Sequence, residues 1–288
     1  MSQPKNHHYL PVFYLSRWCG GDGRVFRYYR PHDKVVCSSV TPDNTGYERF
    51  LYSFDGVADH RRQMLETEFF TPAVDTPAAR ALAVLLDGAG EVSSTKSDWA
   101  RFLMALRLRN PASLEEVEQL SLGVIHNLTS SPTDPEYLAV KQAGDPDTLL
   151  QWMEVHTPHV LRNAGKIFLP GLIDHEGIGG HLVSMKWGTI DLRRADRSLL
   201  VGDRPLLIVN GLKDKNCVVL LPISPTRLFV ATNDERQIQK LLKRGDRYLA
   251  GVVNDEIVRR ATRHVYGSGP GHLNFVQSRL VNRTSSRL

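Results

Sequence analysis

The most constraining feature of this sequence is a change of character near residue 165. Between about residues 59 and 163, apolar residues recur at helical spacing in segments that Gly and Pro separate. From residue 165 onward the apolar runs are short and split by Gly, Pro and Asp: KIFLP, HLVSMKW, LLVG, LLIVN, CVVLLPI and RLFVAT. Helices followed by strands predict an α+β fold whose main sheet, antiparallel or mixed, lies in the second half.

We therefore expect a single domain over residues 1–288, with a helix-rich part (59–163), a strand-rich part (165–232) and a basic helical end (233–266). An N-terminal β-hairpin is predicted from residues 24–30 and 34–39, because a turn-forming Pro31-His32-Asp33 separates two β-branched and aromatic runs. Two closing helices are predicted over about 233–243 and 246–263.

Within the helix-rich part we expect helices over about 59–70 and over 76–86, the second capped by Thr76 and stopped by Gly88 and Gly90. A third begins at the serines of 94–97 and places Trp99, Phe102, Leu103 and Leu106 on one face. A fourth begins at Ala112 and places Leu114, Val117, Leu120 and Val124 on one face. Helical periodicity returns over about 146–163, and GLIDHEGIGGH (171–181) is predicted to be a flexible loop because its histidines do not have zinc-protease spacing.

Composition limits the class of protein. With 41% hydrophobic and 23% charged residues the chain is expected to be globular rather than disordered or fibrous. No uninterrupted apolar run reaches the roughly 18 residues of a membrane span, and the N-terminus lacks a secretory signal pattern. We therefore expect a cytoplasmic protein without a membrane partner. The sequence leaves the oligomeric state open.

Charge is concentrated at the end of the chain. Residues 236–288 hold eleven Lys/Arg and three Asp/Glu, a balance of +8, whereas the whole chain carries +5. Such a segment attracts phosphates, so nucleic acid is a candidate partner through the basic C-terminal end. The alternative is that these charges only solvate exposed helices.

The N-terminal block KNHHYLPVFYLSRW concentrates His7, His8 and Tyr9 with further aromatic residues. Neighbouring side chains of a strand point to opposite faces, so His7 and His8 are not expected to serve one site together. The inward one would be a general base or a metal ligand. The alternative is that the apolar residues anchor the terminus and the histidine only makes a local hydrogen bond.

Charged residues elsewhere offer further candidates. Glu66 and Glu68 are two residues apart on a predicted helix, so at most one of them faces a site. Arg109, at a helix end, would cap carbonyl groups or hold an anionic ligand. Asp203, with Arg204 at the corner between two strands, would bind a metal or orient a base, or else only satisfy backbone donors as a turn residue.

Seven blocks then suggest a family: HHYLPVFYLSRW, GRVFRYYR, LETEFFTPAV, ALRLRNP, LLVGDRPLLI, LPISPTRLFV and VNDEIVRRATRHVYG. Their order over nearly the whole chain resembles the family called domain of unknown function 4238. The resemblance marks His7, His8, Tyr9, Pro11, Glu66 or Glu68, Arg109, Asp203, Pro205, Ser224, Pro225, Asn254 and Arg263. The chain departs at Gly202, where the family pattern usually has Ser or Thr.

This set of residue types suits a metal-assisted hydrolase, and a nuclease of bacterial conflict or defence is the leading hypothesis. His8 would be base or ligand with His7 beside it, Glu68 and Asp203 would bind Mg²⁺ or Mn²⁺, and Arg109 or Arg263 would hold phosphate. Further binding roles are assigned to Tyr9, Glu66, Arg204, Asn254 and Arg263. The alternative is a non-catalytic nucleic-acid- or protein-binding module in which the same residues form a structural buried polar network. Convergence of His8, Glu68 and Asp203 on one pocket would distinguish the two.

Overall fold

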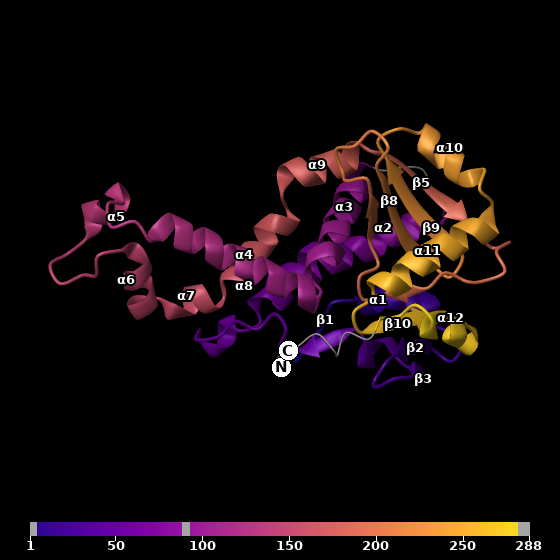
Figure 1. Cartoon of the computed structure of the whole chain (residues 1–288), viewed down its shortest axis with the longest axis horizontal. Coiled ribbons are helices and arrows are strands. Elements are labelled where there is room, and N and C mark those ends of the chain that lie inside the picture. Colours follow the sequence, from indigo (N-terminus) through magenta and orange to yellow (C-terminus); the bar gives the residue numbers. More distant parts are fainter. Residues whose placement is uncertain (1–4, 88–92, 282–288) are drawn as a thin grey trace.

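A computed structural model describes residues 5–87 and 93–281 of the chain. The protein has an α+β fold that consists of a body and a protruding helical arm (Figure 1). The helices are α1 (Val12–Leu15), α2 (Thr76–Asp87), α3 (Ser93–Leu108), α4 (Pro111–Thr129), α5 (Pro135–Val140), α6 (Leu149–His156), α7 (Pro158–Arg162), α8 (Ala164–Ile173), α9 (Glu176–Ser184), α10 (Arg236–Leu242), α11 (Asp246–Arg260) and α12 (Leu273–Gln277). The strands are β1 (Asn6–His8), β2 (Val25–Tyr29), β3 (Val36–Val40), β4 (Tyr47–Arg49), β5 (Lys186–Asp191), β6 (Val201–Gly202), β7 (Leu207–Val209), β8 (Val218–Ser224), β9 (Arg227–Thr232) and β10 (His264–Gly267).

The strands form three antiparallel sheets. One sheet has the order β5-β9-β8-β7, a second has the order β3-β2-β10-β6, and β1 pairs with β4 alone. The predicted hairpin is confirmed, since β2 pairs with β3 from Val25 opposite Val40 to Tyr29 opposite Val36. The N-terminal segment after β1 is held on the sheet that contains β8, because the Tyr14 hydroxyl donates to the carbonyl of Pro222 in β8 at 2.6 Å.

The sheet containing β8 and β9 separates two apolar cores. On β9, Phe229 and Ala231 face a core that includes α3, and the Trp99 ring lies 5.8 Å from the Phe229 ring. Leu228 and Val230 alternate with them and face the core that α11 covers. Helices therefore lie on both faces of this sheet, which explains why its central strands are apolar without interruption.

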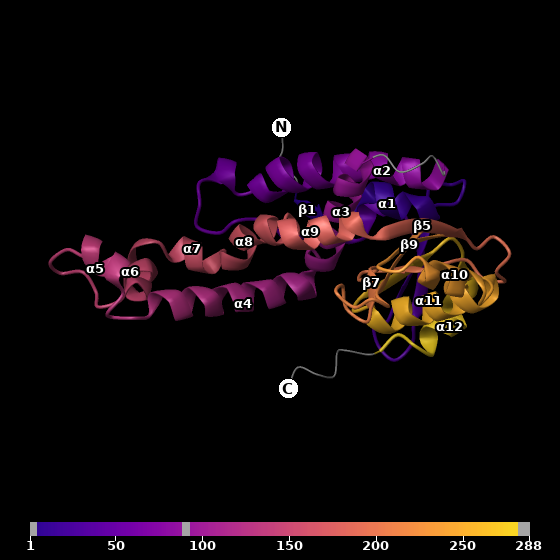
Figure 2. The same cartoon turned by 90° about the horizontal axis from the view of Figure 1, so that it is seen from above.

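The helical region differs from expectation at its beginning. Leu65–Asp75 is a π-helix that continues directly into α2, so Thr76 lies inside the helix and does not cap it. Figure 2 shows this long helix running beside α3. By length and composition alone, Asp59–Asp87 could cross a membrane, and 33% of its most apolar stretch is buried. Phe70 and Val74 of this segment lie in the core. The predicted stops at Gly88 and Gly90 lie outside the described residues.

The strand-rich part begins later than predicted. The predicted strands KIFLP and HLVSMKW are wrong as far as residue 184, because α8 and α9 occupy this part of the chain. The predicted loop GLIDHEGIGGH lies in the same two helices and is mostly helical. The structural reason is packing: α8 lies against α4, where Gly165 approaches Glu118 so closely that a Cβ would come within 2.7 Å of its Cα. Tertiary contact thus overrides the local strand pattern.

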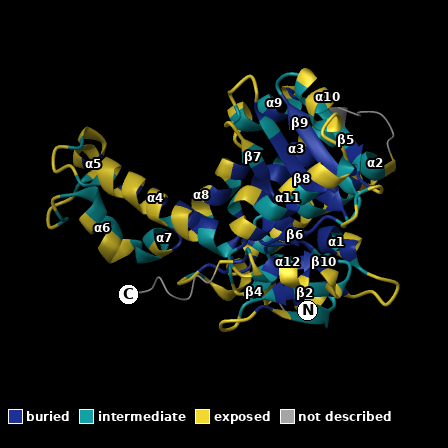
Figure 3. Cartoon of the chain, turned by 45° about the vertical axis from the view of Figure 1, so that its right-hand side comes forward, coloured by how far each residue is buried: buried dark blue, intermediate teal, exposed yellow. Residues whose placement is uncertain are grey.

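The arm is built from α4 and α8, with α5 and α6 at its tip and α7 between α6 and α8 (Figure 1). Its side chains are more exposed than those of the body, as Figure 3 shows. Only part of the predicted face of α4 is buried, because Leu114 and Val117 contact the core while Leu120 is 72% and Val124 51% exposed. The predicted closing helices are confirmed as α10 and α11.

Candidate functional site

The two adjacent histidines of β1 point in different directions, as their strand spacing predicts. His7 is fully buried; its Nδ1 accepts a hydrogen bond from the Tyr52 amide at 2.8 Å, and its ring stacks on the Tyr52 ring. His8 is half-buried and donates from Nε2 to the Asp43 carbonyl at 3.3 Å, while burial lowers the pKa of its imidazole. The inward histidine is therefore His7, and it supports the backbone after β4.

Arg109 is a buried tether for the N-terminal segment. Its Nη1 donates to Asp75 Oδ1 at 2.6 Å, and its Nη2 donates to Asp75 Oδ2 at 3.2 Å and to the His8 carbonyl at 2.7 Å. Burial lowers the pKa of Arg109, but the Asp75 carboxylate outweighs it and keeps the guanidinium charged. Because both terminal nitrogens are occupied, Arg109 is not positioned to clamp a phosphate. Of its two expected roles, bonding to a carbonyl group is the one that the structure shows.

The two glutamates of the π-helix diverge, as predicted. Glu66 turns toward Arg109 and Asp75; its buried Oε2 has no hydrogen-bond partner, and burial raises its pKa to about 7. Glu68 is exposed and lines a groove on the other side of the helix. A π-helix often accompanies a functional site, and here it directs a carboxyl group into the protein interior.

Asp203 organises the entry to β10. Its carboxylate accepts hydrogen bonds from the Thr262 amide at 2.9 Å, the Thr262 hydroxyl at 2.7 Å and the Arg263 amide at 2.6 Å. Beside it, the Cβ of any residue replacing Gly202 would lie 3.3 Å from the Ile257 carbonyl, so this strand approaches α11 too closely for the usual Ser or Thr to fit without adjustment. Asp203 thus satisfies backbone donors, which was the second of its two expected roles.

The other sequence-derived binding residues also make structural contacts. Asn254 accepts from the Leu200 amide at 2.8 Å and donates to the Ser198 carbonyl at 2.9 Å, so it ties α11 to the segment before β6. Arg204 reaches the α4 side of the body, where it lies 3.9 Å from Glu116.

The proposed metal set does not converge. Within residues 5–87 and 93–281, no group of three or more His, Cys, Asp or Glu side chains could hold a metal ion. The physical reasons are separate for each residue: Asp203 is saturated by backbone and hydroxyl donors, Glu68 faces outward, and His8 is engaged by a carbonyl. The described residues therefore do not fit the Mg²⁺ or Mn²⁺ site expected from sequence.

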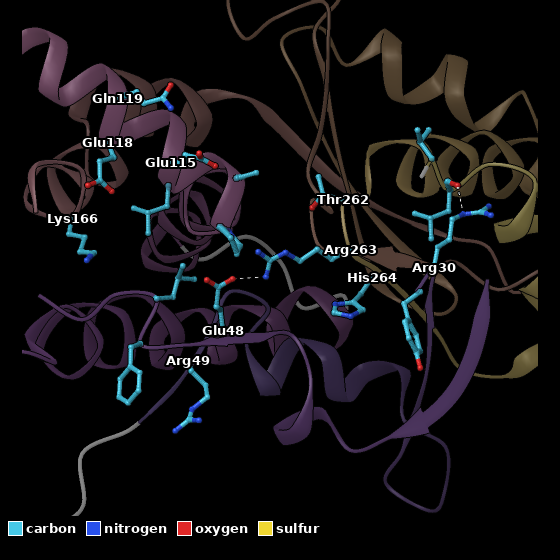
Figure 4. A pocket seen from close by; sticks show the side chains of 18 residues that line it. Arg30, Glu48, Arg49, Glu115, Glu118, Gln119, Lys166, Thr262, Arg263 and His264 are labelled. Carbon is cyan, nitrogen blue, oxygen red and sulfur yellow. Dashed lines mark hydrogen bonds and ion pairs between the residues drawn. The ribbon is translucent and has the colours of Figure 1, made fainter. Parts of the chain in front are cut away.

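One of the marked residues, Arg263, lines a cavity of about 1200 Å³ between β4, the first turns of α4 and the start of β10 (Figure 4). Its polar lining includes Glu48, Glu115, Glu118, Gln119, Lys166, Thr262, Arg263 and His264. Asp203 shapes its wall from behind, because it fixes the backbone of Thr262 and Arg263. The Arg263 guanidinium enters the cavity and pairs with Glu48 at 2.5 Å, as Figure 4 shows.

His264 is one of the residues of this cavity that sequence reasoning missed. Its Nδ1 lies 3.3 Å from the hydroxyl of Tyr9. Burial, assisted by the positive charges of Arg27 and Arg263, lowers the pKa of His264 to about 4, so its imidazole is neutral at pH 7. Burial also raises the pKa of Tyr9 well above its usual value, so the Tyr9 hydroxyl and the His264 imidazole are both neutral at pH 7. The available signal was its place next to Arg263 in a family-like block.

Two aromatic rings border the cavity, from Tyr29 and Phe50. Phe50 has a φ of 60°, which is rare for a bulky residue, and its ring is 41% exposed. Hydrogen bonds hold this conformation, since its amide donates to the Lys5 carbonyl and its carbonyl accepts from the Ser53 amide, each at 2.9 Å. The Arg49 guanidinium lies 5.5 Å from the ring centre. Strained, exposed aromatic residues of this kind are typical of ligand sites.

The fold and cavity define an α+β protein with helices on both faces of its main sheet and a polar site beside the N-terminal segment. Residues 6–270 match the family model described as protein of unknown function (DUF4238), and the chain belongs to this family. The resemblance that the seven blocks suggest is thereby confirmed. No curated protein and no solved structure matches the chain.

Proposed function

We propose that the protein binds a short stretch of single-stranded nucleic acid in the cavity between β4, α4 and β10. An arginine, a neutral imidazole and two aromatic rings meet there, and this meeting carries the proposal. Proteins that bind single strands combine cations for the phosphates with aromatic rings on which bases stack. Arg263 would bind a phosphate, and Phe50 and Tyr29 would offer surfaces to the bases.

The cations of the cavity are not equivalent. Arg263 pairs with Glu48 on a surface where both side chains are partly exposed, so a phosphate can compete for its guanidinium. Arg30 donates to the backbone carbonyls of Asp33, Gln277 and Leu280 and is therefore a structural residue. Of these two arginines, Arg263 is accordingly the one whose loss should weaken binding more.

Acidic groups on the α4 wall of the cavity limit the number of phosphates that the ligand can carry. Glu115 and Glu118 of α4 would repel a continuous string of phosphates, but their oxygens accept hydrogen bonds from base amino groups and ribose hydroxyls. We therefore infer a ligand of one or a few nucleotides whose phosphate lies near Arg263 and whose base and sugar face α4.

The basic C-terminal helices supply less free charge than their composition suggests. Within the described residues, Arg247 pairs with Asp196, Arg259 and Arg279 with Asp255, and Arg260 with Glu256. Paired surface charges attract a polyanion weakly. We therefore base the nucleic-acid proposal on Arg263, because it is the basic residue of this end whose position lines the cavity.

Phosphodiester hydrolysis in the same cavity is a second candidate, favoured by His264. In the tautomer that donates from Nδ1 to the Tyr9 hydroxyl, Nε2 of His264 would accept a proton from a water that attacks a phosphate held by Arg263, and would return it to the leaving oxygen as the P–O bond breaks. Because the pKa of His264 is about 4, the imidazole is a weak base at pH 7 and this hydrolysis would be slow. This chemistry uses residues of the cavity and needs no step through a metal. It retains the hydrolase hypothesis with a different set of residues.

Fluorescence anisotropy with labelled single-stranded RNA and DNA, over a range of salt concentrations, tests the binding proposal. Arg263→Gln should weaken binding about tenfold and reduce its salt dependence. Arg260→Gln is the matched control, since Arg260 is also exposed and paired with a glutamate but does not line the cavity. Equal losses from both variants, or no binding by the wild type, would exclude the cavity as the site. Cleavage in the presence of EDTA that His264→Gln abolishes would favour hydrolysis.

A further inference from the structure

The part of α4 that extends along the arm carries a row of exposed apolar side chains. Leu120 is 72%, Val124 51% and Leu128 69% exposed, and these residues lie four positions apart on successive turns. Residues four apart on a helix are neighbours on its surface, so the three side chains form one continuous row, which we call the arm stripe. Single apolar residues on a surface are common, but a continuous row of them is typical of an interaction surface.

The helix around the arm stripe carries no formal charge. Residues 119–133 include no Asp, Glu, Lys or Arg, although all of them except Ser121 and Ile125 are exposed or half-buried. A helix that faces water normally carries charged side chains on its exposed side, whereas the centre of a protein interface is depleted of charge. The arm stripe therefore offers nothing to attract nucleic acid or a charged peptide, and it suits an uncharged apolar partner surface.

The spacing of the arm stripe is symmetric about Val124. Leu120 and Leu128 each lie four residues from it, so the stripe reads the same in both directions of the helix. A two-fold axis at Val124 would place Val124 against Val124, and Leu120 against Leu128, of a second copy. A two-fold interface needs such a self-complementary surface, and it disfavours charge near the axis because each charge would meet its own copy. A second copy of this chain meets both conditions.

We propose that two copies of this chain associate through the arm stripe, with their α4 helices antiparallel across a two-fold axis at Val124. Rows of residues four apart on two helices interdigitate at a crossing angle of about −50°. Because the arm protrudes from the body, the two bodies would lie at opposite ends of the contact (Figure 1). The stripe is small beside the roughly 800 Å² per partner of a stable interface, so the dimer should be weak and depend on concentration. The stripe does not line the cavity, so this proposal is independent of the proposed function.

Sedimentation velocity over a range of protein concentrations tests the dimer on the full chain. The sedimentation coefficient of the wild type should rise with concentration. Val124→Glu and Val124→Lys should each raise the dimer dissociation constant at least about tenfold, because like charges would meet at the axis. An equimolar mixture of these two variants should associate again, since opposite charges then meet. This recovery is expected only where Val124 of one copy contacts Val124 of the other.

Val252→Glu is the matched control, because Val252 is also an exposed valine of a helix but lies on α11 in the body. It should associate as the wild type does. Both valines are exposed, so the variants should fold, which circular dichroism checks. A wild type that stays monomeric, equal association of Val124→Glu and the wild type, or a mixture that stays monomeric would overturn the proposal. Binding of a monomeric wild type to phosphatidylcholine vesicles, lost in Val124→Glu, would overturn it by assigning the arm stripe to a membrane surface.

Discussion

The carboxylate of Asp203 holds the backbone of Arg263, with the amide nitrogen 2.6 Å from Oδ2, while the side chain of the same arginine enters the cavity. A buried acid thus sets the position of an exposed base without touching its charged group. Two residues that the family-like blocks mark separately therefore act on one short turn. The turn connects the buried polar network to the surface at which a ligand would bind.

Replacing Asp203 by alanine should destabilise the protein by about 2 to 4 kcal/mol, because the amides of Thr262 and Arg263 would lose their acceptor in a buried place. Urea unfolding measures this change. Asp196→Ala is the control, since Asp196 is a surface residue paired with Arg247 and its removal should change stability little. Similar losses would show that Asp203 does not organise this turn.

The two histidines should respond differently to alanine substitution. His7→Ala should cost about 3 kcal/mol, because it opens a cavity and leaves the Tyr52 amide without its acceptor. His8→Ala should cost about 1 kcal/mol or less, since His8 is half-buried and its hydrogen bond is long. Thermal and urea unfolding of both variants would check the order, and a larger effect at His8 would contradict it.

Arg109→Met should destabilise the protein by about 3 to 5 kcal/mol, since it leaves the Asp75 carboxylate and the His8 carbonyl without their donor. Arg109→Lys should recover only part of this loss, because a single ammonium cannot reproduce the forked contact with both Asp75 oxygens. Equilibrium unfolding provides both values. Full recovery by lysine would mean that charge alone, and not geometry, holds the N-terminal segment.

Glu66 should make stability depend on pH. Its pKa is raised from 4.5 to about 7, so the folded protein binds this proton more tightly than the unfolded chain, and stability falls as pH rises between these values. Glu66→Gln should therefore stabilise the protein by on the order of 2 kcal/mol near pH 8 and leave it nearly unchanged near pH 4. Exposed Glu68→Gln should show no such trend. Unfolding curves across this pH range would decide.

Much of the fold follows from local pattern. The hairpin of β2 and β3 has turn residues between β-branched runs, and α3 has Trp99, Phe102, Leu103 and Leu106 on one buried face. These elements are predictable because the side chains that define the pattern also contact the core. The α+β class follows from the same patterns.

Other elements depend on contacts that sequence does not display. The runs KIFLP and HLVSMKW read as strands and residues 171–181 as a loop, yet α8 and α9 form there. For α8 the small Gly165 allows close packing on α4. Leu120 and Val124 fit a core-facing stripe, yet α4 has left the body at that point and they face outward.

The candidate site shows the same limit. The blocks identify Tyr9, Asp203 and Arg263, and residue type assigns Asp203 to a metal and Arg263 to a phosphate. In the structure Asp203 accepts hydrogen bonds from backbone amides, Tyr9 contacts His264, and Arg263 lines the cavity. Glu48 and His264 become visible only when β4 and β10 come together in three dimensions.

The arm has a consequence for how this chain can vary in length. Its first turns supply Glu115 and Glu118 to the cavity, and α8 returns Lys166 to the same place, so everything between them forms a side branch of the domain. Because α4 and α8 run together, whole turns can be added to or removed from both helices without moving the cavity walls. The tip is therefore the natural place for insertions and deletions, and for a fluorophore or an affinity tag that must not disturb the site.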